Sequence, residues 1–281
     1  MAMLDRLKSL FRRRAGFAAL DAAQFPRFEA GAVWLVGAGP GAPGLLSLLG
    51  YHALQQADVV VHDALVSPRL LAMAGPRAEI VFAGKRGGRP SPQQADISLK
   101  LVDLARRGHR VLRLKGGDPF MFGRGGEEAL ALAEAGISFR IVPGISSGLG
   151  GLAYAGIPVT HRDANQTVIF LTGHDETGGL PQVVDWTAIA KAAPVIVMFM
   201  AVRHLPNIAG KLLAAGRDPA DRLAVVSNGT LPDQSVVETT LGAAGSLADL
   251  ETPAIVVVGP VSAYRPLLDW YAPDLRENGI G

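Results

Sequence analysis

Short apolar runs that end in glycine-rich or charged loops, each followed by a stretch of helical periodicity, recur along this chain and constrain its fold more than any other feature. In the first half these runs predict strands at residues 33–36, 59–62, 79–83, 110–114 and 139–142. Strands that alternate with helices are typical of α/β proteins. We therefore predict an α/β fold with five strands in its first domain.

The second half continues the pattern less regularly. Strands are predicted at residues 168–172, 195–200, 223–227 and 254–259, with a hairpin strand near 236–240. The segment 143–148 (PGISSG) predicts a hinge, and a length of 281 residues suits two domains. We expect a flexible N-terminal extension (residues 1–30), an N-terminal α/β domain (31–143) and a C-terminal α/β domain (144–281).

The composition excludes several classes of protein. Because the chain has no cysteine, disulfides, thiolate metal sites and cysteine nucleophiles are excluded, and a reducing compartment, the cytoplasm, is expected. The net charge is +2, and residues 1–30 carry six basic against three acidic side chains. Since the rest of the chain shows no basic stripe, no nucleic-acid binding is expected. No apolar run reaches the roughly 18 residues of a membrane-spanning helix, so no span is expected.

The loops that directly follow the predicted strands are the first place to look for a site. In an open α/β sheet the ligand crevice lies outside the carboxyl ends of the strands. Four such loops, after the strands that end near Val36, His62, Ala83 and Leu114, contain glycine clusters or charged residues. Several loops of this kind at one sheet edge favour a binding site over simple tight turns.

The first of these loops permits a dinucleotide-binding interpretation. The pattern G-x-G-x-x-G/A is matched by Gly37, Gly39 and Ala42. Asp58 or Asp63 lies at about the spacing expected for a ribose-binding carboxylate. Against this interpretation, Pro40 and Pro43 stand where a pyrophosphate needs free backbone N–H groups. A nicotinamide-dependent reductase therefore remains an alternative.

Other catalytic patterns are missing from the sequence. There is no G-x-x-x-x-G-K-[ST] phosphate-binding loop and no G-x-S-x-G nucleophile turn. The six histidines show neither H-E-x-x-H nor H-x-H spacing, so no metal site is expected. These absences disfavour nucleotide hydrolysis, acyl transfer through a serine nucleophile, and metal-dependent chemistry.

Five motifs in a fixed order carry a family resemblance. They are VWLVGAGPGAPG (residues 33–44), HDALV (62–66), GKR (84–86), KGGDPFMFGRG (115–125) and YAGIPVTHR (154–162). Over about residues 32–260 the chain resembles the tetrapyrrole methylases, and within them the enzymes that act on uroporphyrinogen III. It departs from them at Ala42, where an aspartate is more common, and at Ser146 and Ser147, where Thr-Ala or Thr-Ser is common.

The resemblance implies a fold and a reaction. It implies two α/β domains with S-adenosylmethionine bound between them, and a homodimer. It also implies methylation of uroporphyrinogen III at C2 and C7, giving precorrin-2 for cobalamin or siroheme synthesis and S-adenosylhomocysteine as the second product. The enzymes of the cobalamin branch with a single function are the expected type, since nothing before residue 30 resembles the dehydrogenase and chelatase module of the fused enzymes.

The resemblance also implies site residues. The cofactor is assigned to Pro40, Gly116, Gly117, Asp118, Met121, Ser146, Ser147, Met200 and Gly229. Asp63 is implied as the proton acceptor and Lys85 as the proton donor, and we add Arg124 as a candidate clamp for a substrate carboxylate. Besides the reductase, two alternatives remain open: a methylase of a later precorrin, and a regulator that binds S-adenosylmethionine without turnover.

Overall fold

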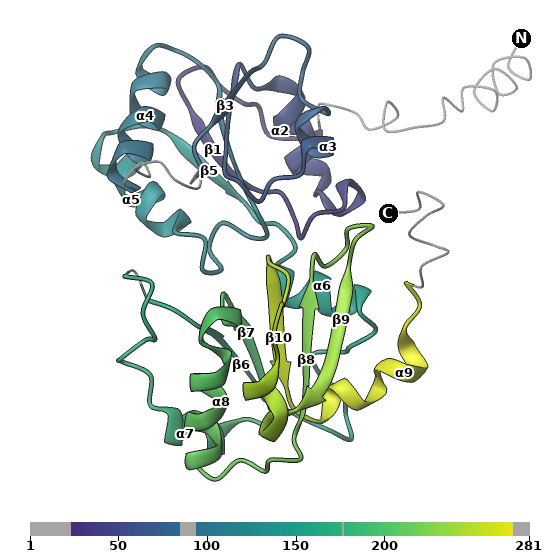
Figure 1. Cartoon of the computed structure of the whole chain (residues 1–281). Coiled ribbons are helices and arrows are strands. Elements are labelled where there is room, and N and C mark those ends of the chain that lie inside the picture. The colour runs from purple at the N-terminus through teal and green to yellow at the C-terminus, as the bar shows by residue number, and fades with distance from the viewer. Residues whose placement is uncertain (1–23, 85–93, 176, 272–281) are drawn as a thin grey trace, which may run out of the picture.

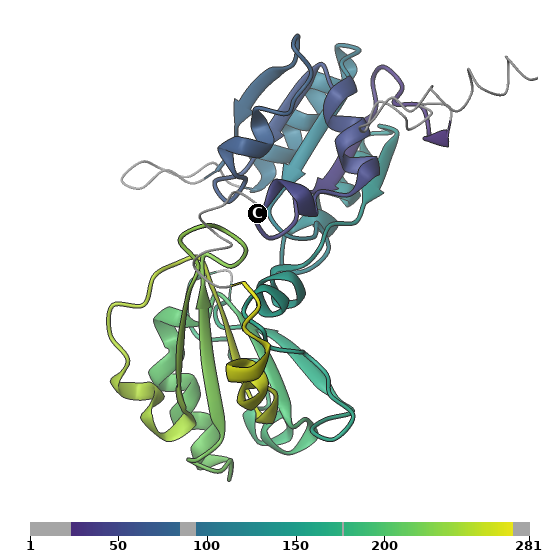
Figure 2. The ribbon, with the colours of Figure 1, turned by 90° about the vertical axis from the view of Figure 1, so that its right-hand side faces the viewer.

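The computed structural model describes residues 24–84, 94–175 and 177–271, which form two bodies stacked one above the other (Figure 1). Figure 2 shows the bodies meeting at a narrow junction, where the helix α6 (Ser147–Tyr154) lies. Each body is built on one five-stranded sheet. The predicted two-part α/β architecture is therefore confirmed, whereas the exact boundary between residues 143 and 144 stays a prediction.

The N-terminal body contains a fully parallel sheet with the order β3-β2-β4-β1-β5. Its strands are β1 (Val33–Gly37), β2 (Val59–His62), β3 (Glu79–Phe82), β4 (Val111–Lys115) and β5 (Phe139–Val142). The helices between them are η3 (Pro43–Leu45), α2 (Leu48–Gln56), α3 (Pro68–Leu71), α4 (Gln94–Arg106) and α5 (Gly125–Glu134). Because β1 and β4 are neighbours at the centre, the loops that follow them meet at one edge of the sheet.

Alternate residues of β1 explain why this sheet is covered on both faces. Trp34 and Val36 pack into one apolar cluster with α2, while Val33 and Leu35 pack into a second cluster with α4 and α5. All five residues of β1 are buried. A strand enclosed on both faces gives a continuous apolar run, which is the pattern visible in the sequence.

The packed part of this body begins earlier than the expected boundary at residue 31. Phe28 is only 2% exposed, and its ring stacks on Trp34 with 4.6 Å between centroids. Phe25 likewise stacks on His52, at 4.8 Å. Phe25 and Phe28 therefore pack against the N-terminal body, while the expected domain boundary stays a prediction.

The C-terminal body contains a mixed sheet with the order β6-β7-β10-β8-β9, in which only β6 and β7 are parallel. The strands are β6 (Val168–Thr172), β7 (Val195–Phe199), β8 (Arg222–Ser227), β9 (Ser235–Thr240) and β10 (Ala254–Val258). The helices, besides α6, are α7 (Trp186–Ala192), η4 (Val202–His204), α8 (Leu205–Ala214), η5 (Leu241–Ser246), η6 (Pro260–Tyr264) and α9 (Arg265–Leu268).

This second sheet is also enclosed on both faces. Residues of α7 and α8 pack with Ile196 and Met198 on one face, and Leu152 of α6 packs with Val195 and Val197 on the other. In the part of the chain that the structure describes, no helix is both long and apolar enough to cross a bilayer.

Candidate functional site

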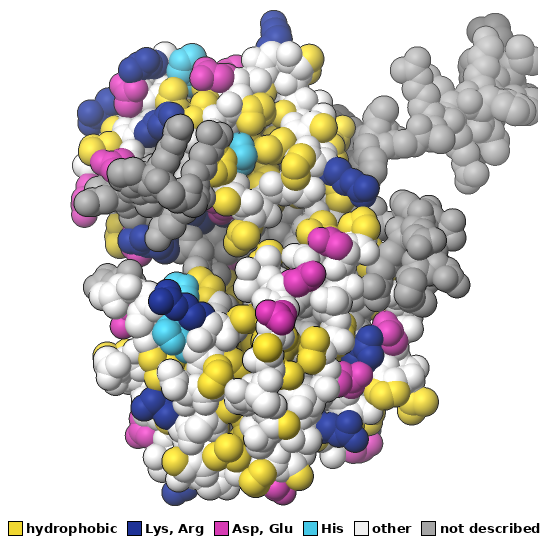
Figure 3. Space-filling model, in the orientation of Figure 1, with side chains coloured by type: hydrophobic (Ala, Val, Ile, Leu, Met, Phe, Trp, Pro, Cys, Tyr) yellow, Lys and Arg dark blue, Asp and Glu magenta, His cyan; other side chains and the backbone are white. Residues whose placement is uncertain are grey.

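A cavity of about 760 Å³ lies between the two bodies. Its walls are the loops that follow β1, β2, β3 and β4 in one body and those that follow β6, β7 and β8 in the other. The parallel sheet thus presents its carboxyl edge to this space, which is where α/β folds place ligands, and the mixed sheet contributes the carboxyl ends of β6, β7 and β8 with the amino end of β10. Figure 3 shows one side of the molecule, with the two bodies meeting across the middle of the view.

The floor of the cavity is formed by two glycine-rich loops in direct backbone contact. The Gly39 N–H donates to the Gly117 carbonyl at 3.1 Å, and the Gly117 N–H donates to the Gly39 carbonyl at 2.8 Å. A Cβ atom on Gly37 would lie 2.5 Å from the Cα atom of Gly144. Gly117 has φ of +65°, a left-handed conformation that favours glycine. The glycines are therefore needed for this close approach.

These contacts remove support from the dinucleotide interpretation of the first loop. The N–H groups of Ala38 and Gly39 already donate to backbone carbonyls of the β4 loop. The Ala42 N–H donates to Thr230 Oγ1 of the C-terminal body at 3.0 Å. Because Pro40 and Pro43 have no N–H, the loop does not present the row of free donors that a pyrophosphate requires.

All nine residues implied to bind the cofactor line this cavity. Asp63 and Arg124 line it too, while Lys85 lies outside the described residues. Residues separated by more than 180 positions in the sequence are thus brought to one space. Their individual roles remain predictions, and the local geometry of several of them bears on those roles.

Ser146 and Met200 have features that suit a bound ligand. Ser146 is 6% exposed, lies at the cap of α6, and its Oγ has no hydrogen-bond partner among the described residues. Met200 follows β7 with φ of +54° and is 41% exposed, so it is not a core methionine. A buried hydroxyl that lacks a partner is costly unless a ligand supplies one.

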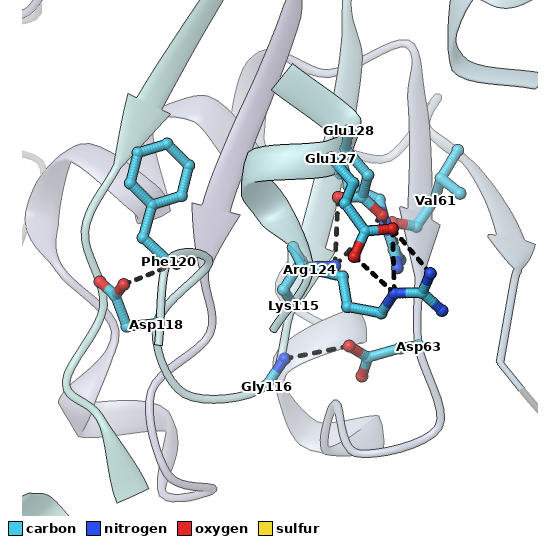
Figure 4. A network of polar contacts seen from close by, with 10 residues as sticks. Val61, Asp63, Lys115, Gly116, Asp118, Phe120, Arg124, Glu127 and Glu128 are labelled. Atoms are coloured by element: carbon cyan, nitrogen blue, oxygen red, sulfur yellow. Dashed lines mark hydrogen bonds and ion pairs between the residues drawn. The ribbon is translucent and has the colours of Figure 1, made fainter. Parts of the chain in front are cut away.

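Asp118 holds the floor together. One oxygen of its carboxylate accepts from the Phe120 N–H at 2.8 Å (Figure 4), and the other accepts from the Gly144 N–H at 3.0 Å. The side chain therefore ties the loop after β4 to the segment that enters the C-terminal body. Each oxygen keeps a second lone pair, so a further bond from a ligand hydroxyl or amino group is compatible with this role.

Asp63 stands at the carboxyl end of β2, between two loops. Its Oδ1 accepts from the Leu65 N–H at 3.0 Å, and its Oδ2 accepts from the Gly116 N–H at 3.3 Å (Figure 4). The first bond is the local turn that an aspartate commonly makes after a strand. The second bond joins the loops after β2 and β4, and it fixes the carboxylate at the cavity wall.

A buried ion cluster beside Asp63 was not among the predicted site residues. Arg113, Lys115 and Glu128 are only 2%, 3% and 0% exposed. Glu128 accepts from Arg113 Nε at 3.0 Å and lies 3.1 Å from Lys115 Nζ, and Figure 4 shows Lys115 and Glu128 in the same network of polar contacts as Asp63. Burial, and then the charge of Arg113, lower the pKa of Lys115.

A sequence signal for this cluster existed. Arg113 and Lys115 alternate with apolar residues inside an otherwise buried strand, so both side chains project from the same face of the sheet. Two cations on one face of a buried strand require a buried carboxylate nearby. Glu128 supplies it from α5, one turn after the glycine-rich loop.

Arg124 differs from the expectation of an available carboxylate clamp. It caps α5 with φ of +60° and is about half exposed. Its guanidinium already binds Glu127, with Nε to Oε1 at 3.0 Å and Nη2 to Oε2 at 2.6 Å (Figure 4). A substrate carboxylate would have to compete with this pair.

Comparisons with known proteins agree with this geometry. Over residues 32–245 the sequence matches the family described as Tetrapyrrole (Corrin/Porphyrin) Methylases. It is 60% identical over 251 residues to a uroporphyrinogen-III C-methyltransferase of a Sinorhizobium species, covering 88% of this chain and 90% of that protein. A solved uroporphyrin-III C-methyltransferase from Thermus thermophilus, complexed with S-adenosylhomocysteine, matches with a TM-score of 0.73 and 38% identity, over 83% of this chain and 99% of that one.

Longer relatives match this chain over only about half of their own length. Siroheme synthase 1 of Klebsiella pneumoniae is 45% identical over 247 residues, which amount to 88% of this chain and 52% of that protein. The chain therefore spans about half the length of the siroheme synthases it matches.

Proposed function

The chain belongs to the tetrapyrrole methylase family, and from that premise we propose that it transfers methyl groups from S-adenosylmethionine to C2 and C7 of uroporphyrinogen III, giving precorrin-2. The similarity to single-function C-methyltransferases over nearly their whole length supports this reaction. The other activities of the longer siroheme synthases are not assigned to it. The observation that carries the proposal is the cavity between the bodies, which gathers all nine residues implied to hold the cofactor.

The residues of the cavity fit S-adenosylmethionine. The unpartnered Ser146 hydroxyl, the outward Met200 side chain and the close glycine backbone at Gly117 suit a ligand with hydroxyl, adenine and amino-acid parts. Bound there, the cofactor supplies an electrophilic methyl group on a sulfonium. Its positive charge needs no metal to activate it towards an electron-rich pyrrole carbon.

The protein's own part in the reaction is positioning, exclusion of water and proton removal. Two backbone hydrogen bonds join the glycine-rich loops that form the floor of the cavity. These loops hold the cofactor and the macrocycle in fixed relative positions. Asp63, held by the Gly116 N–H at the cavity wall, accepts the proton that the macrocycle loses after the carbon–carbon bond forms. Lys85 remains the proposed donor on sequence grounds alone.

The exchange of Asp63 for asparagine tests this assignment. Asp63→Asn keeps the shape and one of the two backbone bonds, because an amide has a single acceptor oxygen, but it cannot take up a proton. We expect methyl transfer to uroporphyrinogen III to fall by roughly 100-fold or more, the usual contribution of a general base. Affinity for S-adenosylhomocysteine, measured by calorimetry, should stay unchanged.

Asp58→Asn is the matched control, because Asp58 is at the opposite end of the sheet and pairs with Arg110 there. It should keep near wild-type turnover. An Asp63→Asn enzyme as active as the control would remove Asp63 from the mechanism. A wild-type protein that methylates a later precorrin but not uroporphyrinogen III would instead favour the alternative substrate.

The homodimer and the cytoplasmic location also remain proposals. Large apolar side chains near the junction are exposed, among them Phe120 (58%), Ile145 (40%) and Leu149 (48%). Such a patch favours an interface between copies. Sedimentation velocity tests the dimer, and a monomer at micromolar concentration would contradict it. The lack of cysteine supports a reducing compartment.

A further inference from the structure

The charged residues that line the cavity differ in whether they already have a partner. Four are cationic: Arg113, Lys115, Arg124 and Arg203. Glu128 binds the first two, and Glu127 binds Arg124. Among the described residues, Arg203 makes no ion pair or hydrogen bond through its side chain. Of the four cations that the structure describes in the cavity, Arg203 is therefore the one whose charge is open to a ligand.

Arg203 lies on the wall opposite Asp63, in the C-terminal body. It belongs to η4, directly after β7 and Met200. The loop after the parallel neighbour β6 presses against this segment: the Gly173 N–H donates to the Phe199 carbonyl at 2.7 Å, and a Cβ on Gly173 would lie 2.3 Å from the Cα of Ala201. The backbone that carries Arg203 is thus firmly held.

Two histidines fix the surroundings of Arg203. His204 Nε2 is 2.9 Å from the Gly178 carbonyl, which ties η4 to the β6 loop. His174, which lines the cavity from that loop, has Nδ1 2.9 Å from the Asp175 carbonyl. Figure 3 shows histidine and basic atoms side by side on the edge of the lower body that faces the upper one.

The acidic residue described on this loop does not neutralise Arg203. Asp175 Oδ1 accepts from the backbone N–H groups of Thr177 and Gly179 and from the Thr177 hydroxyl, at 2.7–3.0 Å. Its carboxylate is engaged within its own turn. Among the described residues, no carboxylate forms an ion pair with Arg203.

We propose that Arg203 forms a carboxylate-binding subsite that holds one acetate or propionate group at the periphery of the tetrapyrrole. This inference rests on the proposed function, because uroporphyrinogen III carries eight carboxylates around its ring. A guanidinium binds a carboxylate through two parallel N–H···O bonds, and so it fixes the orientation of the macrocycle as well as its affinity. The contact is remote from the reacting carbons, so it acts equally in the bound state and in the transition state.

The test is the variant Arg203→Gln, which keeps a polar side chain but shortens it and removes the charge. Because a charged hydrogen bond contributes more than a neutral one, we expect KM for uroporphyrinogen III to rise ~10-fold. Because this contact stabilises the bound substrate and the transition state equally, its loss should leave kcat nearly unchanged. Affinity for S-adenosylhomocysteine should not change. Arg222→Gln is the matched control, since Arg222 is an exposed arginine at the start of β8 and does not line the cavity.

A binding measurement separates this inference from the proposed reaction. Uroporphyrin III, the oxidised macrocycle with the same eight carboxylates, is titrated by fluorescence in the presence of S-adenosylhomocysteine. Weaker binding by Arg203→Gln than by Arg222→Gln supports the subsite even if wild-type protein methylates nothing. Equal affinity and equal KM in the two variants would overturn it, whatever the activity of the wild type.

Discussion

The single residue on which the buried ion cluster depends is Glu128. Its carboxylate faces two cations, and all three side chains are at most 3% exposed. Glu128→Gln leaves Arg113 and Lys115 with one neutral partner in a buried place. We expect the free energy of unfolding to fall by about 3–5 kcal/mol, the cost of breaking a buried ion pair. Urea denaturation at pH 7 measures it.

Glu127→Gln is the control for this change. Glu127 and Arg124 are both more than half exposed, so their ion pair should contribute less than about 1 kcal/mol. If the two variants lose the same stability, the cluster does not hold the wall of the cavity together.

Gly117 combines a left-handed backbone conformation with a position on the wall of the cavity. Gly117→Val places a β-branched side chain at φ of +65° and within 3.6 Å of Ser147. We expect affinity for S-adenosylhomocysteine to fall at least ~10-fold, equivalent to 1.4 kcal/mol. Calorimetry beside a thermal melt checks it, and Gly126→Ala, with open space around its Cβ position, is the control. A folded Gly117→Val protein with wild-type affinity would move the cofactor away from this loop.

At the scale of elements, Asp58 and Arg110 join the amino ends of β2 and β4, far from the cavity. The carboxylate accepts from Arg110 Nη2 at 2.6 Å and from the Arg110 backbone N–H at 2.8 Å. The Arg110 side chain, more than any other group, lowers the pKa of Asp58 from 3.8 to about 2. Because the folded pKa lies below the unfolded one, the contribution to stability is present above pH 3.8 and is lost as the pH falls towards 2.

Asp58→Asn measures this contribution. Both side chains are about one third exposed, so screening by solvent limits the expected loss at pH 7 to ~1 kcal/mol. The difference in unfolding free energy between wild type and variant should shrink as the pH is lowered from about 4 to about 2. Denaturant titrations over this range test it. A difference that stays constant would show that the pair is not the source of the effect.

The sequence predicted the elements of the two bodies unequally well. Enclosed strands such as β1 and β7 gave continuous apolar runs, and their positions agree with the structure to within one or two residues. The strand directions of the second sheet were not predicted, because an apolar run carries no information on direction. The hairpin strand β9 was found near its expected place, from alternation on a half-exposed strand.

At the scale of the whole molecule, the site depends on contacts that no local pattern contains. The motif series predicted residues from both bodies, and they line one cavity. The pairing of Arg124 with Glu127 is local, three residues apart at the start of α5, whereas the position of Arg203 on the cavity wall without an ion pair to any described residue became visible only in the fold. A sequence indicates which residues are basic, but the fold decides which of them is already neutralised.

The proposed activity is the methylation of two carbons of one macrocycle bound in the cavity between the bodies. The most direct test incubates the full chain with uroporphyrinogen III and S-adenosylmethionine carrying a carbon-13 methyl group, and follows the product by mass spectrometry and carbon NMR. We expect two labelled methyl groups, at C2 and C7, and two molecules of S-adenosylhomocysteine per macrocycle. An unlabelled macrocycle, or a label at any other ring position, would contradict it.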